Sequence, residues 1–150
     1  MEVWFWDSSA LVKRYFDEPG TATVRGWAAD AARQHWITRI TLAEISSAIV
    51  RRIPANDAAQ YLAQFDTDVR SFNIGSMDDA LVTEAIALTR RYQLRGCDSL
   101  QLAAARRLDN AITQLNASQT DSADSFYFVC SDAELNRAAA VCGLAVINPV

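Results

Sequence analysis

The chain has 150 residues, a length typical of one domain that buries roughly 70% of its unfolded surface. Hydrophobic residues make up 51% and charged residues 21% of the sequence, which excludes an intrinsically disordered protein, and no apolar run approaches the roughly 18 residues of a membrane span. The net charge of −4 means that the molecule as a whole does not attract nucleic acid, so any polyanion must be bound locally.

Short apolar runs alternate with amphipathic stretches along the chain. The runs predicted to be strands are residues 3–6, 36–38, 71–74, 126–130 and 145–147, and the helical patterns span 42–53, 80–92 and 100–112. A break begins at Pro54, and Asn56 with Asp57 indicates another helix. This order predicts an α/β domain over residues 1–150, with a mostly parallel sheet covered on both faces and the first strand at its centre. The polar stretch 116–125 is expected to be a loop or a helix extension.

The cysteines and the single histidine limit the kinds of metal and disulfide site. Cys97, Cys130 and Cys142 are an odd, widely spaced set, which is typical of reduced thiols in a cytoplasmic protein. His35 is the only histidine, so a structural zinc site, which needs four cysteine or histidine ligands, is not expected.

Four acidic residues follow the predicted strands or begin a predicted helix. Asp7 ends the first strand, Glu44 lies a few residues after the second, and Asp132 follows the fourth. Asp98 comes soon after Gly96 at the start of the longest helical pattern. Because open parallel sheets bind ligands beyond the carboxyl ends of their strands, these four carboxylates have a common place to meet.

Each acid also has a simpler explanation as part of a helix cap. Asp7 can cap a helix that starts at Ser8 or Ser9. The pairs that fit capping boxes are Thr41 with Glu44, Asp98 with Gln101, and Ser131 with Glu134, the last of which places Asp132 in the first turn of its helix.

Convergence of the four acids has an energetic consequence that capping does not offset. Two like charges 4 Å apart cost about 4 kcal/mol at an effective dielectric near 20, whereas a cap returns about 1 kcal/mol. A cluster therefore requires either that some acids are protonated or that a cation lies among them. Hard oxygen ligands without histidine or thiolate favour Mg²⁺ or Mn²⁺.

The four acids lie in the segments FWDSSALVKRYF, ITLAEISSAIVRR, LRGCDSLQLAAARRL and VCSDAELNRAA. These segments resemble the acidic motifs of PIN domains, and VapC-type ribonuclease toxins are the most similar members. The resemblance implies a three-layer PIN-like fold, with a five-stranded parallel sheet in the order 3-2-1-4-5 flanked by helices, and RNA cleavage that depends on Mg²⁺ or Mn²⁺. Two features depart from the family: residues 109–125 are longer than usual, and Trp4 and Trp6 are bulkier.

The resemblance also assigns roles and partners. It places the catalytic acids at Asp7, Glu44, Asp98 and Asp132, and a small hydroxyl at Ser8 or Ser9. Asp7 and Asp98 are expected to bind the metal, with Glu44 and Asp132 acting directly or through water, on one ion or on two. Ser9 and Ser131 are the expected supporting residues, although Ser131 fits a capping role equally well. The implied partners are RNA, a second copy of the chain, and a small antitoxin that blocks the groove.

Two questions stay open at the level of sequence. Several arginines have the chemistry to meet RNA phosphates, but an arginine on a helix is more often solvated, so none is assigned a role; they are Arg14, Arg39, Arg51, Arg52, Arg95, Arg106 and Arg107. The alternative function is a PIN scaffold with weak catalysis that binds protein or RNA. A phosphatase with an Asp-x-Asp motif is excluded because two serines follow Asp7.

Overall fold

The apolar run near the start of the sequence forms the central strand of a parallel sheet. The structure is a computed structural model that describes residues 1–118 and 123–150. Within these ranges the sheet has five strands in the order β3-β2-β1-β4-β5, and every pairing is parallel. The strands are β1 (Glu2–Trp6), β2 (Arg33–Thr38), β3 (Asn73–Gly75), β4 (Ser125–Val129) and β5 (Val146–Ile147). The predicted fold class and strand order are therefore confirmed.

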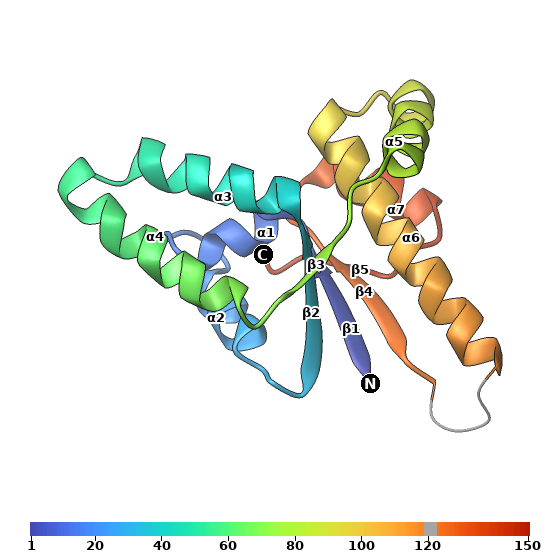
Figure 1. Ribbon diagram of the computed structural model, residues 1–150, viewed down its shortest axis with the longest axis horizontal. Coiled ribbons are helices and arrows are strands. Elements are labelled where there is room, and N and C mark those ends of the chain that lie inside the picture. The colour runs from blue at the N-terminus through green and yellow to red at the C-terminus, as the bar shows by residue number, and fades with distance from the viewer. Residues whose placement is uncertain (119–122) are drawn as a thin grey trace.

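Helices cover both faces of this sheet, as Figure 1 shows. On one side lie α1 (Ser8–Leu11), the short 3₁₀ helix η1 (Val12–Arg14), α2 (Thr21–Ala28), α3 (Arg39–Arg52) and α4 (Ala55–Val69). On the other side lie α5 (Asp79–Tyr92), α6 (Gly96–Ser118) and α7 (Ala133–Val141). The sheet is thus the middle of three layers, and its carboxyl edge opens between α3 and α6. Among the helices of the described ranges, none is long and apolar enough to cross a membrane.

The four large apolar residues of β1 are divided between two hydrophobic cores. Val3 and Phe5 pack with residues of α5, α6 and α7, whereas Trp4 and Trp6 pack with residues of α1 to α4. All four side chains are buried. Successive side chains of a strand point to opposite faces, so a central strand covered on both sides must be apolar at every position. This explains the uninterrupted run that precedes Asp7.

Two predicted capping boxes are wrong because the helices begin earlier than expected. Helix α3 starts at Arg39, and its cap is Thr38, whose hydroxyl accepts a hydrogen bond from the backbone nitrogen of Thr41 at 3.3 Å. Helix α6 starts at Gly96, so Asp98 lies inside its first turn and does not cap it. The acids of these two helices, Glu44 and Asp98, are therefore not held as members of a capping box.

The polar stretch between α6 and β4 is in part a helix extension. Helix α6 runs to Ser118, which is well past the predicted end of its apolar pattern. The rest of that prediction falls partly on residues 119–122, which lie outside the described residues. The amide of Asn116 donates to the carbonyl of Asp124 and accepts from its backbone nitrogen, at 2.8 and 2.9 Å. These two bonds hold the end of α6 against the start of β4.

Candidate active site

The four predicted acids line one hollow at the carboxyl edge of the sheet. The hollow has a volume of about 490 Å³. Its lining consists of Asp7, Ser8, Ser9, Glu44, Arg95, Gly96, Cys97, Asp98 and Asp132. These residues come from the end of β1, from α1, from α3, from the start of α6 with the residue before it, and from the turn after β4. Segments that are far apart in the sequence thus bring their carboxylates to the same place.

Asp7 lies at the floor of the hollow and is only 3% exposed. Its backbone nitrogen donates to the carbonyl of Val129 at 2.9 Å, which extends the pairing of β1 with β4 by one residue. Its carboxylate caps α1 by accepting from the backbone nitrogen of Ser9 at 2.9 Å and from the Ser9 hydroxyl. Burial raises the pKa of Asp7 to about 6, the Ser9 hydrogen bonds oppose this shift, and the charges of Glu44 and Asp98 add to it.

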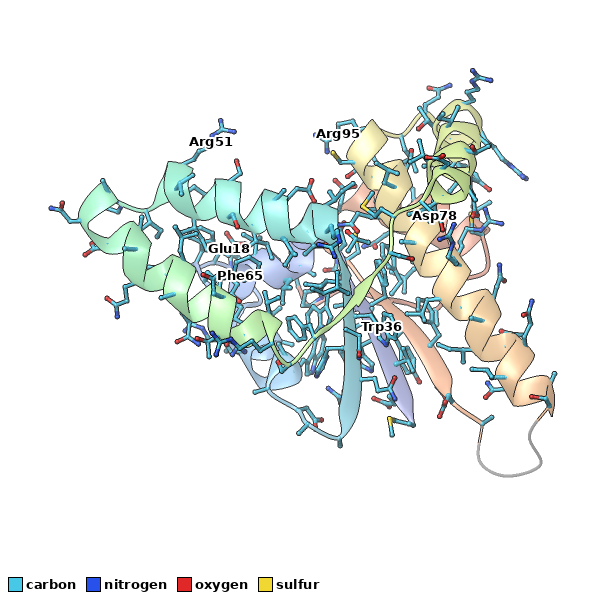
Figure 2. All side chains as sticks on the ribbon, in the orientation of Figure 1. Glu18, Trp36, Arg51, Phe65, Asp78 and Arg95 are labelled. Carbon is cyan, nitrogen blue, oxygen red and sulfur yellow. The ribbon has the colours of Figure 1, made fainter. Side chains whose placement is uncertain are left out.

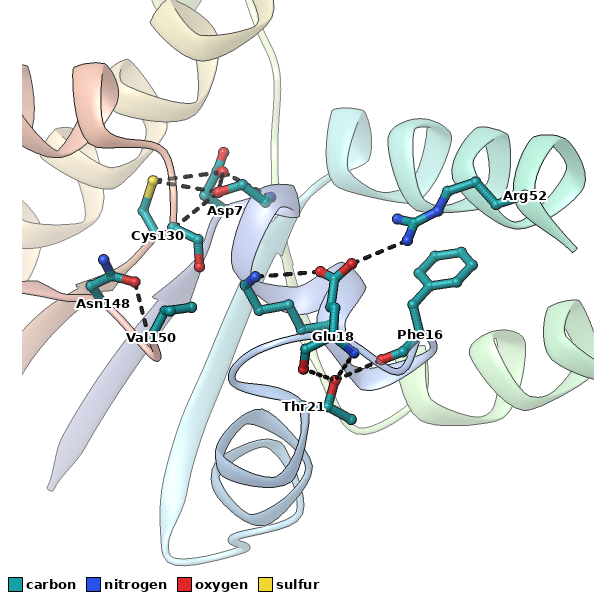
Figure 3. A network of polar contacts seen from close by, with 11 residues as sticks. Asp7, Phe16, Glu18, Thr21, Arg52, Cys130, Asn148 and Val150 are labelled. Carbon is teal, nitrogen blue, oxygen red and sulfur yellow. Dashed lines mark hydrogen bonds and ion pairs between the residues drawn. The ribbon is translucent and has the colours of Figure 1, made fainter.

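A hydroxyl and a thiol fix the orientation of Asp7 (Figure 3). The Ser9 hydroxyl also accepts from the backbone nitrogen of Ser131 at 3.0 Å, so it joins α1 to the turn after β4. The thiol of Cys130 lies 3.7 Å from Oδ2 of Asp7 and accepts from the backbone nitrogen of Asp132 at 3.3 Å. Burial, together with the charge of Asp7, raises the pKa of the Cys130 thiol, so the thiol stays protonated.

Ser131 reaches this cluster through its backbone. Its hydroxyl is buried and has no hydrogen-bond partner among the described residues. It is also not the cap of α7: that cap is Asp132, whose Oδ1 accepts from the backbone nitrogen of Leu135 at 2.9 Å. The expected capping box of Ser131 with Glu134 is therefore wrong. Asp132 keeps its second oxygen, Oδ2, toward the hollow, 3.6 Å from the guanidinium of Arg95.

Glu44 and Asp98 face the hollow from the two helices that flank it. Oε2 of Glu44 is buried and has no hydrogen-bond partner within the described ranges. Burial raises the pKa of Asp98, nearby Arg95 lowers it, and the charge of Asp132 raises it again. A buried carboxylate oxygen without a donor is costly unless a cation or water satisfies it. Glu44 therefore brings a buried oxygen without a donor to the hollow, whereas Oδ2 of Asp98 is paired with Arg95.

A buried glutamine joins α3 to α6 behind these two acids. The side-chain amide of Gln101 is 1% exposed. It accepts from the Thr38 hydroxyl at 2.8 Å and donates to the Thr41 hydroxyl at 2.7 Å. Gln101 lies one turn after Asp98, and Thr41 lies one turn before Glu44. This bridge sets the spacing of the two acids, and the sequence pattern had placed Gln101 only in a capping box.

The donor set fits a hydrated hard cation. Among the residues that the structure describes, no three histidine, cysteine or acidic side chains converge closely enough to hold a metal ion by themselves. Mg²⁺ is usually bound through one or two carboxylates and keeps several waters. Carboxylate oxygens lining one hollow, one of them without a partner, suit that mode of binding.

Most of the arginines considered as RNA contacts already have acidic partners. The ion pairs are Arg14 with Asp68, Arg52 with Glu18, Arg106 with Glu84, Arg107 with Asp78, and Arg95 with Asp98 and Asp132. Figure 3 shows the ion pair between Glu18 and Arg52. Glu18 also pairs with Lys13 at 3.3 Å, so it ties α3 to η1. Arg39 and Arg51 are exposed and make no ion pair with any described residue.

The hollow continues into a groove along α3. A second hollow of about 760 Å³ shares Glu44 and Cys97 with the first and extends to Arg51 and Arg52. Figure 2 shows Arg51 on α3 and Arg95 near the start of α6, on opposite sides of this opening. The site is therefore continuous with a groove that follows α3 as far as Arg51 and Arg52.

Comparisons with known proteins agree with this architecture. The PIN domain family model matches residues 5–114. The crystal structure of DNA-bound VapBC from Salmonella typhimurium has a TM-score of 0.69 at 12% identity, with 100% of each chain covered. The structure of FitAcB from Neisseria gonorrhoeae has a TM-score of 0.66 at 12% identity, with 97% of each chain covered.

A third solved structure, VapBC-1 from nontypeable Haemophilus influenzae, has a TM-score of 0.63 at 8% identity, with 98% of each chain covered. At these identities the solved structures establish similarity of fold. No curated protein sequence matches the chain. The family match spans most of the chain and includes Asp7, Glu44 and Asp98. The chain belongs to the PIN domain family.

Proposed function

We propose that the protein is an endoribonuclease that depends on Mg²⁺ or Mn²⁺ and hydrolyses RNA phosphodiesters. The observation that carries this proposal is the convergence of Asp7, Glu44, Asp98 and Asp132 on one hollow. Membership of the PIN family supports it, because PIN domains are generally nucleases. The groove along α3 suits a polymer better than a small substrate.

The four acids have two proposed roles. Asp98 and Asp7 would hold the metal, and Glu44 and Asp132 would complete its shell directly or through water, or orient the attacking water. When bound, the metal would lower the pKa of that water and stabilise charge on the phosphate oxygens. Ser9 orients Asp7 through its two hydrogen bonds, and the protonated Cys130 thiol packs beside Asp7 without adding a charge.

The proposed biological role is that of the toxin in a type II toxin–antitoxin pair. The similar solved structures are described as VapBC and FitAcB or FitAB assemblies. By analogy of fold, we propose that a small antitoxin covers the groove, that the toxin forms a homodimer, and that it acts in the cytoplasm. Light scattering of the purified chain, alone and with a candidate antitoxin, would measure these two associations.

The nuclease activity is tested with purified protein and a labelled, folded RNA. With Mn²⁺, the wild type is expected to cut the RNA and Asp98→Asn to lose at least about 100-fold in rate, because the variant loses a charged metal ligand. Excess chelator should stop cleavage, and added Mn²⁺ should restore it. Asp66→Asn is the matched control, because Asp66 is exposed on α4 and outside the hollow.

The same experiment separates catalysis from the alternative of a binding scaffold. If the protein is a binding scaffold, the wild type and Asp98→Asn should bind RNA or protein equally well. Neither should show cleavage that depends on metal. Activity that persists in excess chelator, or that survives Asp98→Asn unchanged, contradicts the proposed function.

A further inference from the structure

One arginine of the chain contacts the carboxylates of the site. Nε of Arg95 lies 3.2 Å from Oδ2 of Asp98, and Nη2 lies 3.6 Å from Oδ2 of Asp132. The guanidinium therefore bridges two acids that come from α6 and from the turn before α7. The guanidinium contacts the same carboxylate oxygens that a bound cation would use.

The backbone of Arg95 is anchored in the fold, whereas its side chain is largely exposed to solvent. The carbonyl of Arg95 accepts from the backbone nitrogen of Ser99 at 3.0 Å, in the first turn of α6, and the preceding Leu94 is buried. The side chain itself is 79% exposed. Figure 2 shows it beside the start of α6, projecting away from the ribbon. Ion pairs this exposed contribute little free energy, so the guanidinium can leave with small cost.

Because both are positively charged, the guanidinium and a divalent cation compete for the carboxylates of Asp98 and Asp132. Without a cation, Arg95 offsets the repulsion between Asp98 and Asp132. A divalent ion carries twice the charge and repels the guanidinium as it binds the same carboxylates. The displaced side chain remains anchored beside the hollow, where a phosphate group is the anion available to it.

We propose that Arg95 is a displaceable counter-ion of the active site. It occupies the carboxylates of Asp98 and Asp132 in the metal-free protein, and metal binding releases it to bind a phosphate of the RNA. This inference rests on the proposed function for its second half. Its first half concerns only the binding of metal, which is measured without RNA.

The test compares Mn²⁺ affinity in the wild type, Arg95→Ala and Arg51→Ala by isothermal titration calorimetry. Arg95→Ala is expected to lower the Kd for Mn²⁺ about three- to tenfold, because the metal no longer displaces two exposed ion pairs. The difference should shrink at high salt, which screens the guanidinium. Arg51→Ala removes the same charge from the same groove but from a residue without an acidic partner in the described structure, so its Kd should match the wild type.

A second measurement tests whether the released Arg95 side chain binds a phosphate of the RNA. At saturating Mn²⁺, Arg95→Ala should raise KM for RNA more than it lowers kcat, whereas a purely structural role would leave KM unchanged. A Kd for Mn²⁺ that is equal or weaker in Arg95→Ala overturns the counter-ion role, and an unchanged KM overturns the phosphate role. If the wild type does not bind Mn²⁺, or binds it no better than Asp98→Asn does, the proposed function fails together with the inference.

Discussion

Asp7 is a buried carboxyl group that destabilises the metal-free fold. Burial raises its pKa from the ordinary value of 3.8 to about 6. Between these values the native state keeps a proton that the unfolded state has released, so the free energy of unfolding falls as the pH rises toward 6 and stays low above it. The cost at neutral pH is up to about 3 kcal/mol, since one pKa unit corresponds to about 1.4 kcal/mol.

We therefore expect Asp7→Asn to stabilise the metal-free protein at neutral pH. The amide oxygen can still accept from the backbone nitrogen of Ser9, so the cap of α1 is retained while the buried charge is removed. Urea denaturation in the presence of chelator, at about pH 4.5 and about pH 7.5, should show that the wild type loses more stability between the two than the variant does, because the variant lacks the contribution of Asp7. A less stable Asp7→Asn at the higher pH would mean that the charge of the cap matters more than its burial.

The residues of the site differ in how far sequence could identify them. The four acids could be identified from the sequence because three follow predicted strands and one begins a predicted helix. Parallel strands end at one edge of a sheet, so these acids were expected to lie together. Cys130 could not be identified in this way, because its contact with Asp7 joins residues that are 123 positions apart in the sequence. Arg95 is one of many arginines with the same local pattern, and only its ion pairs to Asp98 and Asp132 distinguish it.

At the scale of elements, the Gln101 bridge connects the two helices that carry Glu44 and Asp98. Both polar ends of its amide are paired with the hydroxyls of Thr38 and Thr41 in a buried setting. Removing one member of such a network leaves the others without partners in a place where water does not compensate them.

We expect Gln101→Leu to lower the free energy of unfolding by about 1–3 kcal/mol, because the hydroxyls of Thr38 and Thr41 lose their partner. Nuclease activity should fall further than stability alone explains, since the spacing of the flanking acids is relaxed. Chemical denaturation and cleavage assays measure the two effects. Gln114→Leu, at an exposed position of the same helix, is the control and should change neither.

The elements that sequence predicted best are those with strong periodicity, and the errors have physical causes. The first strand was clear because all its apolar residues are buried on two faces. Helix α2 was not predicted: it begins after Gly20, which has φ of +90° and offers no side-chain cap, and it contains Gly26. The start of α3 was misplaced because Thr38 and Thr41 are both good caps by type, and only tertiary contacts select Thr38.

At the scale of the whole molecule, the sheet joins the two cores into one structural unit. Strand β1 contributes to both, and its neighbours β2 and β4 hold it on either edge. A loss of packing in one core therefore also destabilises the sheet against which the other core packs.

This predicts one cooperative transition for mutations in either core. Ile45→Ala, on the α3 side, and Leu102→Ala, on the α6 side, should each lower the free energy of unfolding by about 2–5 kcal/mol, since both side chains are fully buried. Tryptophan fluorescence and far-ultraviolet circular dichroism should report the same midpoint in each variant. Val50→Ala, at an exposed position, is the control. Separate midpoints for the two probes would show that the cores unfold independently.

The central place of β1 also determines when the four acids can come together during synthesis. The ribosome makes β1 and Asp7 before residues 125–129, which pair with one edge of that strand, and Asp132 follows only after those residues. A nascent chain can therefore display the first acid long before it can gather the fourth. For the ribonuclease proposed above, which is translated from the class of molecule that it would cut, this late assembly would delay activity until most of the chain has been made.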